Sequence, residues 1–333
     1  MNNQGKIEVP RLVAHTENLA RRLLRLEHGA NVFPLAHVGL YYAFLLSLTV
    51  PGLLTATWLR GLCWVLLTLL NFSLTVGVMH MHCHRRLFTV RWLNRLLDVL
   101  MCLPSLLTAS EMLLYHVHAH HKYENGIGDP SSTFGAEKGL RALGYWLAYP
   151  SRCKWYTLRA IFGRKAQEKW RRQRLHMLVD LSLCLCVLAF LAWIDPRNIL
   201  FVWFPSLLVA HLNTGYFAWL THAPVMPAGG PPDSLATVSN LMGFLVHNQG
   251  YHHVHHRYPG IHWTEIPSRL DDMLQVEPQK IVPYWVTLQS CWRLGRPARF
   301  FDHCFGEDWQ RRYLARRQSG RVRLRWLPYF AWI

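Results

Sequence analysis

The 333-residue chain is poor in charged residues, and poorest in acidic ones. Only 17% of its residues are charged, and 19 aspartates and glutamates stand against 36 lysines and arginines. About a quarter of the residues in an ordinary soluble domain are charged, so this composition disfavours one. The net charge of +17 leaves three explanations: nucleic-acid binding, an anionic membrane surface, or the positive cytosolic loops of a membrane protein.

Motifs for disulfides and for common redox carriers are also missing. The eight cysteines form no C-x-x-C pair and no regular framework, which predicts reduced thiols. The chain contains no His-Pro-Gly-Gly haem signature and no dinucleotide-binding fingerprint. The N-terminal stretch has no apolar core of signal-peptide type, so we expect neither secretion nor cleavage.

What the chain does contain is long apolar runs. Each approaches the roughly 20 residues that cross a bilayer core, and together they cover about residues 33–56, 59–79, 176–194 and 199–220. Buried helices of a large soluble protein are disfavoured, because the runs form two pairs, each joined by a very short loop. We predict an all-α integral membrane protein, a single domain over residues 1–333, with four transmembrane helices in two hairpins.

The positive charges predict how the hairpins are oriented. The short loops TATW and DPRN are nearly uncharged, whereas lysine and arginine gather before the first run, between the second and third, and near the C-terminus. By the positive-inside rule, both termini and a helical cap of residues 80–175 and 221–333 face the cytosol. This explains the net charge without nucleic acid, which we do not expect as a partner. The lack of an organelle signal favours a bacterial cytoplasmic membrane over the endoplasmic reticulum.

Two shorter segments are expected at the membrane surface. Residues 11–27 place leucines at near-helical spacing among arginines, which is typical of an interfacial amphipathic helix. Residues 93–107 are apolar but too short for a span, so we expect them to lie in the interface or dip into it. Pro104 in this segment supplies a bend that lets the chain double back.

Histidine is concentrated in three clusters, which the predicted topology brings to one membrane face. They read HMHCH from residue 80, HVHAHH from residue 116 and HHVHH from residue 252. Pairs four residues apart, such as His80 and His84 or His116 and His120, share one face of an α-helix and can bind one ion. A doubled histidine can serve two neighbouring ions. The eight candidate ligands are His80, His84, His116, His120, His121, His252, His255 and His256.

Eight histidines are too many for one ion, so the clusters predict two ions and a ninth ligand. Neutral imidazole binds zinc, copper, iron and nickel. A structural zinc site closes with four ligands and would leave half of these histidines unused. Two iron ions with open positions suit dioxygen chemistry.

The boxes H-x-x-x-H, H-x-x-x-H-H and H-x-x-H-H, in this order around two apolar hairpins, resemble those of the integral-membrane fatty-acid desaturase and hydroxylase superfamily. HHKYENGIGDPSST and HNQGYHHVHHRYPG resemble the sequences around the second and third boxes, and the resemblance covers about residues 35–270. It implies a ninth ligand near the end of the last span, where His222 stands; His211 lies inside the predicted span. Ala218 departs from the asparagine that some relatives carry one turn earlier.

The resemblance implies a non-haem di-iron oxidase that uses dioxygen to desaturate a fatty acid or fatty acyl chain. Oxidative decarboxylation to a terminal alkene and hydroxylation of an acyl chain or alkane are alternatives, because the boxes do not distinguish them. A separate ferredoxin, rubredoxin or cytochrome is the implied electron donor. Two other classes stay open: a histidine-rich metal transporter, which requires ligands at mid-membrane depth, and an inactive membrane scaffold.

Several further polar residues are candidates for orienting the ligands. Asp129 and Glu111 could each hydrogen-bond a ligand imidazole, although a turn acid or a surface acid explains either one equally well. Asn248 could hold a metal-bound water, and His247 could orient a ligand or replace one. The other histidines within the clusters should project away from the ions; they are His82, His118 and His253.

Overall fold

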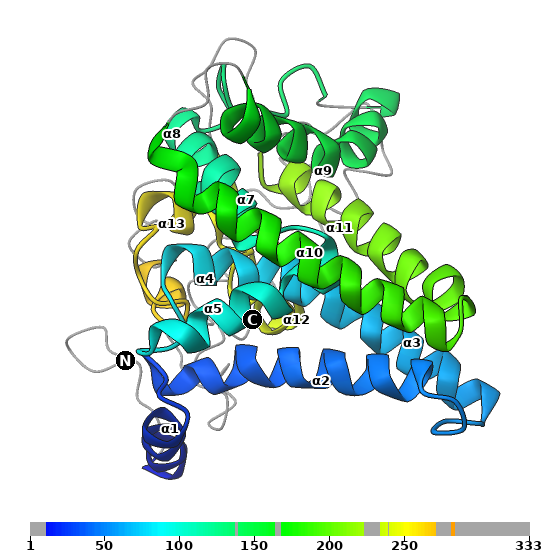
Figure 1. The fold of residues 1–333 in the computed structure, drawn as a ribbon. Helices are drawn as coiled ribbons and strands as arrows, with labels where there is room; N and C mark the ends of the chain where they lie inside the picture. Colours follow the sequence, from blue (N-terminus) through cyan, green and yellow to red (C-terminus); the bar gives the residue numbers. More distant parts are fainter. Residues whose placement is uncertain are drawn as a thin grey trace.

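The computed structural model describes residues 11–136, 139–163, 168–222, 234–238, 240–270 and 281–283. The predicted cap therefore lies partly outside the described residues, including its C-terminal part, residues 284–333. The described chain is mostly helical (Figure 1). Its one sheet is a parallel pair of three-residue strands, β1 (Ala236–Val238) and β2 (Ile281–Pro283).

Within the residues that the structure describes, four helices are long and apolar enough to cross a membrane, as predicted. They cover Gly29–Thr49, Thr57–His84, Glu168–Ile194 and Asn198–His222. The first ends before the predicted residue 56 because Pro51 follows it, and proline cannot continue a helix. The second runs beyond the predicted residue 79. It comprises α3 (Thr57–Phe72), a π-helical segment η2 (Ser73–Met79) and α4 (His80–His84), so the first histidine cluster forms the end of this span.

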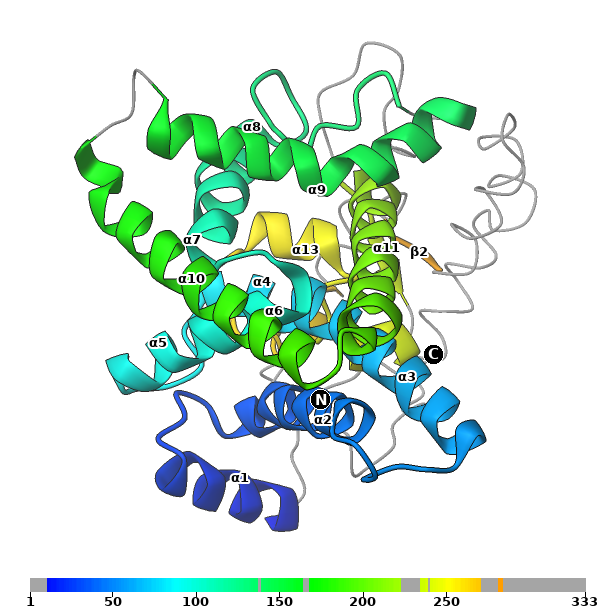
Figure 2. The same ribbon diagram turned by 45° about the vertical axis from the view of Figure 1, so that its right-hand side comes forward.

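The long helices pack around α3 and α11 (Phe204–His222). Helix α2 (Val32–Thr49) contacts α3, and α11 lies between α3 and α9 (Gly139–Phe162). Figure 2 shows α9 crossing one end of α11. Helix α10 (Arg171–Ile194) contacts the other long helices much less. Only 22% of the most apolar 18-residue stretch of its span is buried, and Trp193 is 81% exposed. An apolar helix with such an exposed surface is suited to lipid.

The predicted bend is present as a break between two short helical segments. Helices α5 (Arg91–Leu100) and α6 (Cys102–Ser105) are followed, after a 90° turn, by α7 (Ala109–Met112), the π-helical η3 (Leu113–His120) and α8 (His121–Tyr123). Pro104 lies in the last turn before the break, and Leu106 adopts a left-handed φ of 50°. A new helix begins at Thr108, whose side chain accepts a hydrogen bond from the Glu111 backbone N–H.

Three side chains satisfy the carbonyl groups that the break leaves free. The Trp203 indole N–H donates to the Leu103 carbonyl at 3.0 Å, and His211 Nε2 donates to that of Ser105 at 2.7 Å. Lys154 Nζ donates to the Leu106 carbonyl at 2.8 Å. A break is tolerated inside a membrane protein only when its backbone groups are satisfied in this way. His211 is thus a structural hydrogen-bond donor.

The predicted interfacial segment forms helix α1 (Arg11–Leu23). Its leucines are exposed: Leu12 by 75%, Leu19 by 51% and Leu23 by 72%. An exposed leucine row beside arginines is the pattern of a helix that lies on a membrane surface. Its position in the interface stays a prediction.

Replacement of Trp203 by Phe tests the role of the carbonyl caps at the break. The variant leaves the buried Leu103 carbonyl without a donor, so we expect a loss of about 1–3 kcal/mol of stability. Unfolding of the detergent-solubilised chain would measure it. The matched control is Trp193→Phe on the exposed surface of α10, which should unfold like the wild type; equal effects of the two changes would contradict the assignment.

Candidate metal centre

Nine histidines converge in two neighbouring groups. Within each group, the nitrogen atoms that could bind an ion all lie within 4.8 Å of one another. The first group consists of His80, His84, His116, His121 and His255. The second consists of His120, His222, His252 and His256. These are the nine positions proposed from the sequence; their role as metal ligands stays a proposal, taken up below.

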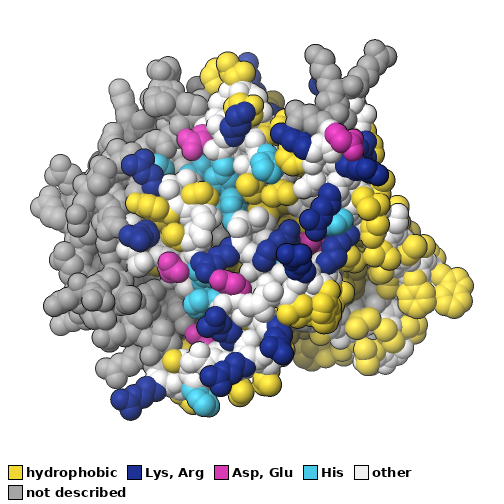
Figure 3. Space-filling view, turned by 60° about the vertical axis from the view of Figure 1, so that its left-hand side comes forward, with side chains coloured by type: hydrophobic (Ala, Val, Ile, Leu, Met, Phe, Trp, Pro, Cys, Tyr) yellow, Lys and Arg dark blue, Asp and Glu magenta, His cyan; other side chains and the backbone are white. Residues whose placement is uncertain are grey.

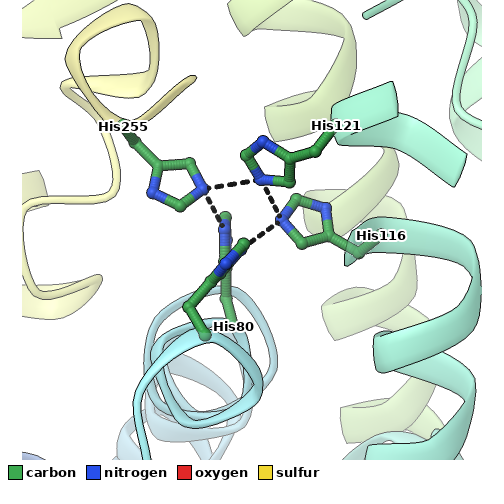
Figure 4. Close-up of side chains that lie close together, drawn as sticks. His80, His116, His121 and His255 are labelled. Atoms are coloured by element: carbon green, nitrogen blue, oxygen red, sulfur yellow. Dashed lines mark hydrogen bonds between the residues drawn. The ribbon is translucent and has the colours of Figure 1, made fainter. Parts of the chain in front are cut away.

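In the first group, the imidazole rings of His80, His116, His121 and His255 point at one another (Figure 4). Its Nε2 atoms form a chain of contacts: His84 to His116 at 3.1 Å, His116 to His121 at 3.1 Å, His121 to His255 at 3.0 Å, and His255 to His80 at 2.9 Å. The second group forms a similar chain: His222 to His252 at 2.9 Å, His252 to His256 at 3.0 Å, and His256 to His120 at 3.1 Å.

Hydrogen bonds among the rings cannot account for this arrangement. One imidazole nitrogen either donates one hydrogen bond or accepts one, yet His116 Nε2 faces both His84 and His121. Ligands at right angles on bonds of about 2.1 Å stand about 3.0 Å apart, and ligands at the tetrahedral angle about 3.4 Å. The observed spacings of 2.9–3.1 Å therefore fit a metal ion with right-angled ligands. Five nitrogens also exceed a four-coordinate structural zinc site.

The second cluster divides between the groups differently from the prediction. His116 and His120 were expected to bind one ion, but His116 groups with His121, and His120 belongs to the other group. The reason is the π-helical η3, whose hydrogen bonds run from residue i to residue i+5 and bring residues five apart onto one face. The α-helical spacing does hold for His80 with His84 and for His252 with His256.

The doubled histidines connect the two groups. His120 and His121 belong to different groups, and so do His255 and His256 on α13 (His252–Arg257). Neighbouring residues on a helix project about 100° apart, so each doubled histidine reaches both ways. The second and third clusters thus hold the groups next to each other. Residues of α4, of η3 and α8, and of α13 meet in these groups, which brings the three clusters together.

Asp129 fixes the orientation of one histidine in the second group. Its Oδ2 lies 2.7 Å from His120 Nδ1, and its carboxylate also accepts the backbone N–H groups of Asn125 and Ser131. Burial raises the pKa of Asp129, but the charge and hydrogen bond of His120 outweigh it, so the pKa lies below its usual value. An ionised Asp129 holds the proton on His120 Nδ1 and leaves Nε2 free for an ion.

The other candidate residues make contacts outside the two groups. Glu111 closes the helix cap at Thr108 and pairs with Lys154 at 2.7 Å, so it faces no histidine of either group. The Asn248 amide donates to the Trp263 carbonyl at 3.1 Å. His247 packs against His37, with ring centroids 4.8 Å apart, and belongs to neither group.

The intervening histidines project away from both groups, as expected. His82 contacts Asp98 at 3.1 Å, His253 contacts Ser234 at 3.0 Å, and His118 is exposed beside Trp170. Asp98 is not among the residues that the sequence indicated. It also binds Arg86 at 2.7 Å and so ties the end of α4 to α5. Its position among the apolar residues of an amphipathic helix was the available signal.

Burial keeps the imidazole rings of the third cluster neutral. It lowers the pKa of His252, His255 and His256 well below the ordinary value, and the neighbouring histidines lower it further. These rings stay neutral at physiological pH, and neutral imidazole is the form that binds a metal.

A cavity of about 40 Å³ lies beside both groups. His80 and His116 line it from the first group, and His120, His222 and His252 from the second. The rest of its wall is mostly apolar or aromatic and includes Val76, Met112, Tyr115, Phe217 and Ala218. A small, mostly apolar space beside two candidate metal sites is suited to an unreactive hydrocarbon group.

The fold and the site together define a helical membrane protein with two buried groups of histidines suited to metal ions. A family model described as fatty acid desaturase matches residues 55–288, and this range contains all nine histidines. The chain therefore belongs to the fatty acid desaturase family, within the membrane di-iron desaturase and hydroxylase superfamily. No curated protein matches the chain.

Replacement of Asp129 by Asn tests the support of His120. The amide cannot act as a carboxylate toward Nδ1, so we expect metal affinity at the second group to fall by about 10–100-fold. Metal titration of the purified chain would measure this. Glu111→Gln is the control, because it removes a buried acid that faces neither group; a comparable loss of affinity in that variant would contradict the role of Asp129.

Proposed function

We propose that this protein is a membrane-bound, non-haem di-iron oxidase that uses dioxygen to desaturate a fatty acyl chain. The observation that carries the proposal is the pair of histidine groups, of five and four imidazoles, which share one mostly apolar cavity. The first group would hold one iron ion and the second group the other. Bound there, the ions would supply dioxygen reduction and the oxidation of an unactivated C–H bond, which no side chain can perform.

The side chains of the cavity would position the substrate. Val76, Phe217 and Ala218 line the space that the histidines of both groups face, so carbons of an acyl chain placed there lie beside both groups. The apolar wall excludes water and limits the orientations of the chain. The overall reaction takes an alkane segment, dioxygen, two electrons and two protons to an alkene and two waters.

Desaturation is preferred over decarboxylation and hydroxylation because the matched family is described by that reaction. All three reactions would use the same residues. A transporter is less well supported, because both groups lie at span ends: His80 and His84 end one candidate span, and His222 ends another. Among the residues that the structure describes, no other group of three or more histidine, cysteine or acidic side chains is placed to hold a metal ion.

The surface beside the site fits an acidic electron donor. Histidines are visible at the centre of one face, where lysine and arginine outnumber the acids (Figure 3). Arg85 and Arg86 follow the first cluster directly, with side chains 38% and 47% exposed. Such charges would steer an acidic ferredoxin, rubredoxin or cytochrome-type protein toward the site. We place this face and both termini in the cytosol, with a bacterial cytoplasmic membrane as the setting.

Product analysis tests the proposed reaction. The purified, iron-loaded chain, supplied with one saturated fatty acid or its thioester, dioxygen and an electron donor, should yield a product that lacks two hydrogen atoms, detectable by mass spectrometry. A terminal alkene one carbon shorter would show decarboxylation, and an added oxygen hydroxylation. His116→Ala should lose activity, whereas His118→Ala should keep it. Zinc transport without dioxygen consumption would overturn the proposal.

Replacement of Ala218 by Phe tests the substrate cavity. The larger ring fills space beside the second group without removing a histidine, so we expect turnover of long acyl chains to fall by about a hundredfold. Metal content should stay at the wild-type level. Ala218→Ser, which adds a single oxygen atom, serves as the conservative control. Unchanged turnover in Ala218→Phe would place the acyl chain elsewhere.

A further inference from the structure

The segment that precedes the third histidine cluster packs directly on the helix that precedes the first histidine cluster. The Ser73 hydroxyl, in η2, donates to the Leu245 carbonyl at the end of α12 (Asn240–Leu245) and accepts from His37 Nδ1 at 2.8 Å. One turn further along η2, Gly77 lies against Val246 and His247. We call this the 73–247 contact. Its members Ser73, Gly77, Val246 and His247 are all buried.

Gly77 is what makes this close approach possible. A Cβ atom at this position would lie 2.7 Å from His247 Nδ1 and 3.0 Å from Val246 Cα. Glycine inside a helix costs about 0.5–1 kcal/mol relative to alanine, so an alanine would be favoured here if the space allowed it. Gly61, in the same span, has no atom within 4 Å of its Cβ position.

The segment on the other side of the contact is held in an unusual conformation. His247 has a φ of 51° and Asn248 a φ of 63°, and left-handed backbone costs a non-glycine residue roughly 1–2 kcal/mol. Such residues persist when their surroundings hold them in place. The segment therefore meets η2 as a fixed surface, four residues before the third cluster begins at His252.

We propose that Gly77 and Ser73 are positioning residues that set the distance between the first-cluster helix and the third cluster. The inference rests on the proposed function, because it concerns the ions that the groups would hold. Gly77 precedes His80 by three residues, and His80 Nε2 meets His255 Nε2 at 2.9 Å across the two segments. A shift of η2 away from residues 246–247 would therefore open the first group.

This contact should affect the second group less than the first. None of its four histidines comes from the first-cluster helix. The third cluster is also held from another side, where Ser234 contacts His253 at 3.0 Å and the Thr237 N–H donates to the Gly250 carbonyl at 2.6 Å. Gly77 should thus act mainly on one ion of the two, which distinguishes positioning from a general loss of structure.

Metal titration of the full chain in detergent, with ferrous iron as the probe, tests the proposal. The wild type and the control Gly61→Ala should each bind two ions. Gly77→Ala should bind one ion as tightly as the wild type and the other about 10–100-fold more weakly, with helical content unchanged by circular dichroism. Adding His247→Ala to Gly77→Ala removes the 2.7 Å contact and should restore part of the lost affinity.

The outcomes separate this inference from the proposed function. Two tight ions in Gly77→Ala, or equal weakening of both, would overturn the inference alone. A wild-type chain that binds no iron would overturn the proposed function and the inference with it. If Gly77→Ala does not fold, Ser73→Ala carries the test, because it removes the two hydrogen bonds of the hydroxyl and adds no atom. It should weaken the same single ion, and an unchanged titration would refute the proposal.

Discussion

The close packing of nine imidazole rings in two neighbouring groups is the main constraint on this structure. Neighbouring Nε2 atoms lie 2.9–3.1 Å apart. They make more contacts than hydrogen bonds can satisfy, because one Nε2, such as that of His116, faces two neighbours at once. In a low-dielectric interior, such unmatched polar atoms are costly. A cation between these nitrogens would offset the cost because they would bind it, and neutral rings favour such binding. The two groups therefore fit the proposal that each of them holds a metal ion.

The membrane constrains where the histidine clusters lie in the fold. The backbone groups of a span must be satisfied within its helix, and the first cluster and His222 lie at the ends of two candidate spans. The second cluster follows a broken segment whose free carbonyls are bound by Trp203, His211 and Lys154. Two π-helical segments, η2 before His80 and η3 through His116, occur at the site itself. π-helical segments are rare overall, but those that occur are often found at functional sites. They orient side chains in directions that an α-helix would not give.

Much of the fold and the site is legible in the sequence. The four apolar runs predicted the four spans, because about 20 apolar residues have few alternatives to a membrane helix. The histidine spacings, together with the family resemblance, selected the nine residues that converge, including His222. The ends of elements were less predictable: Pro51 shortened the first span, and the second continued to His84. The sequence made Glu111 a candidate for orienting a ligand, but its side chain caps a helix. Its partner Lys154 is 43 residues away in the sequence, so local spacing could not reveal the pairing.

The sequence by itself determined which residues could bind metal and that they lie in a membrane protein, because both properties depend on local composition and spacing. Only the tertiary structure decided how the histidines divide into groups of five and four. That division depends on the π-helical turn that pairs His116 with His121, and on contacts between distant segments such as Gly77 with His247. Spacing along a chain fixes a face only when the helix type is known, and a close approach between segments leaves no mark beyond an ordinary glycine.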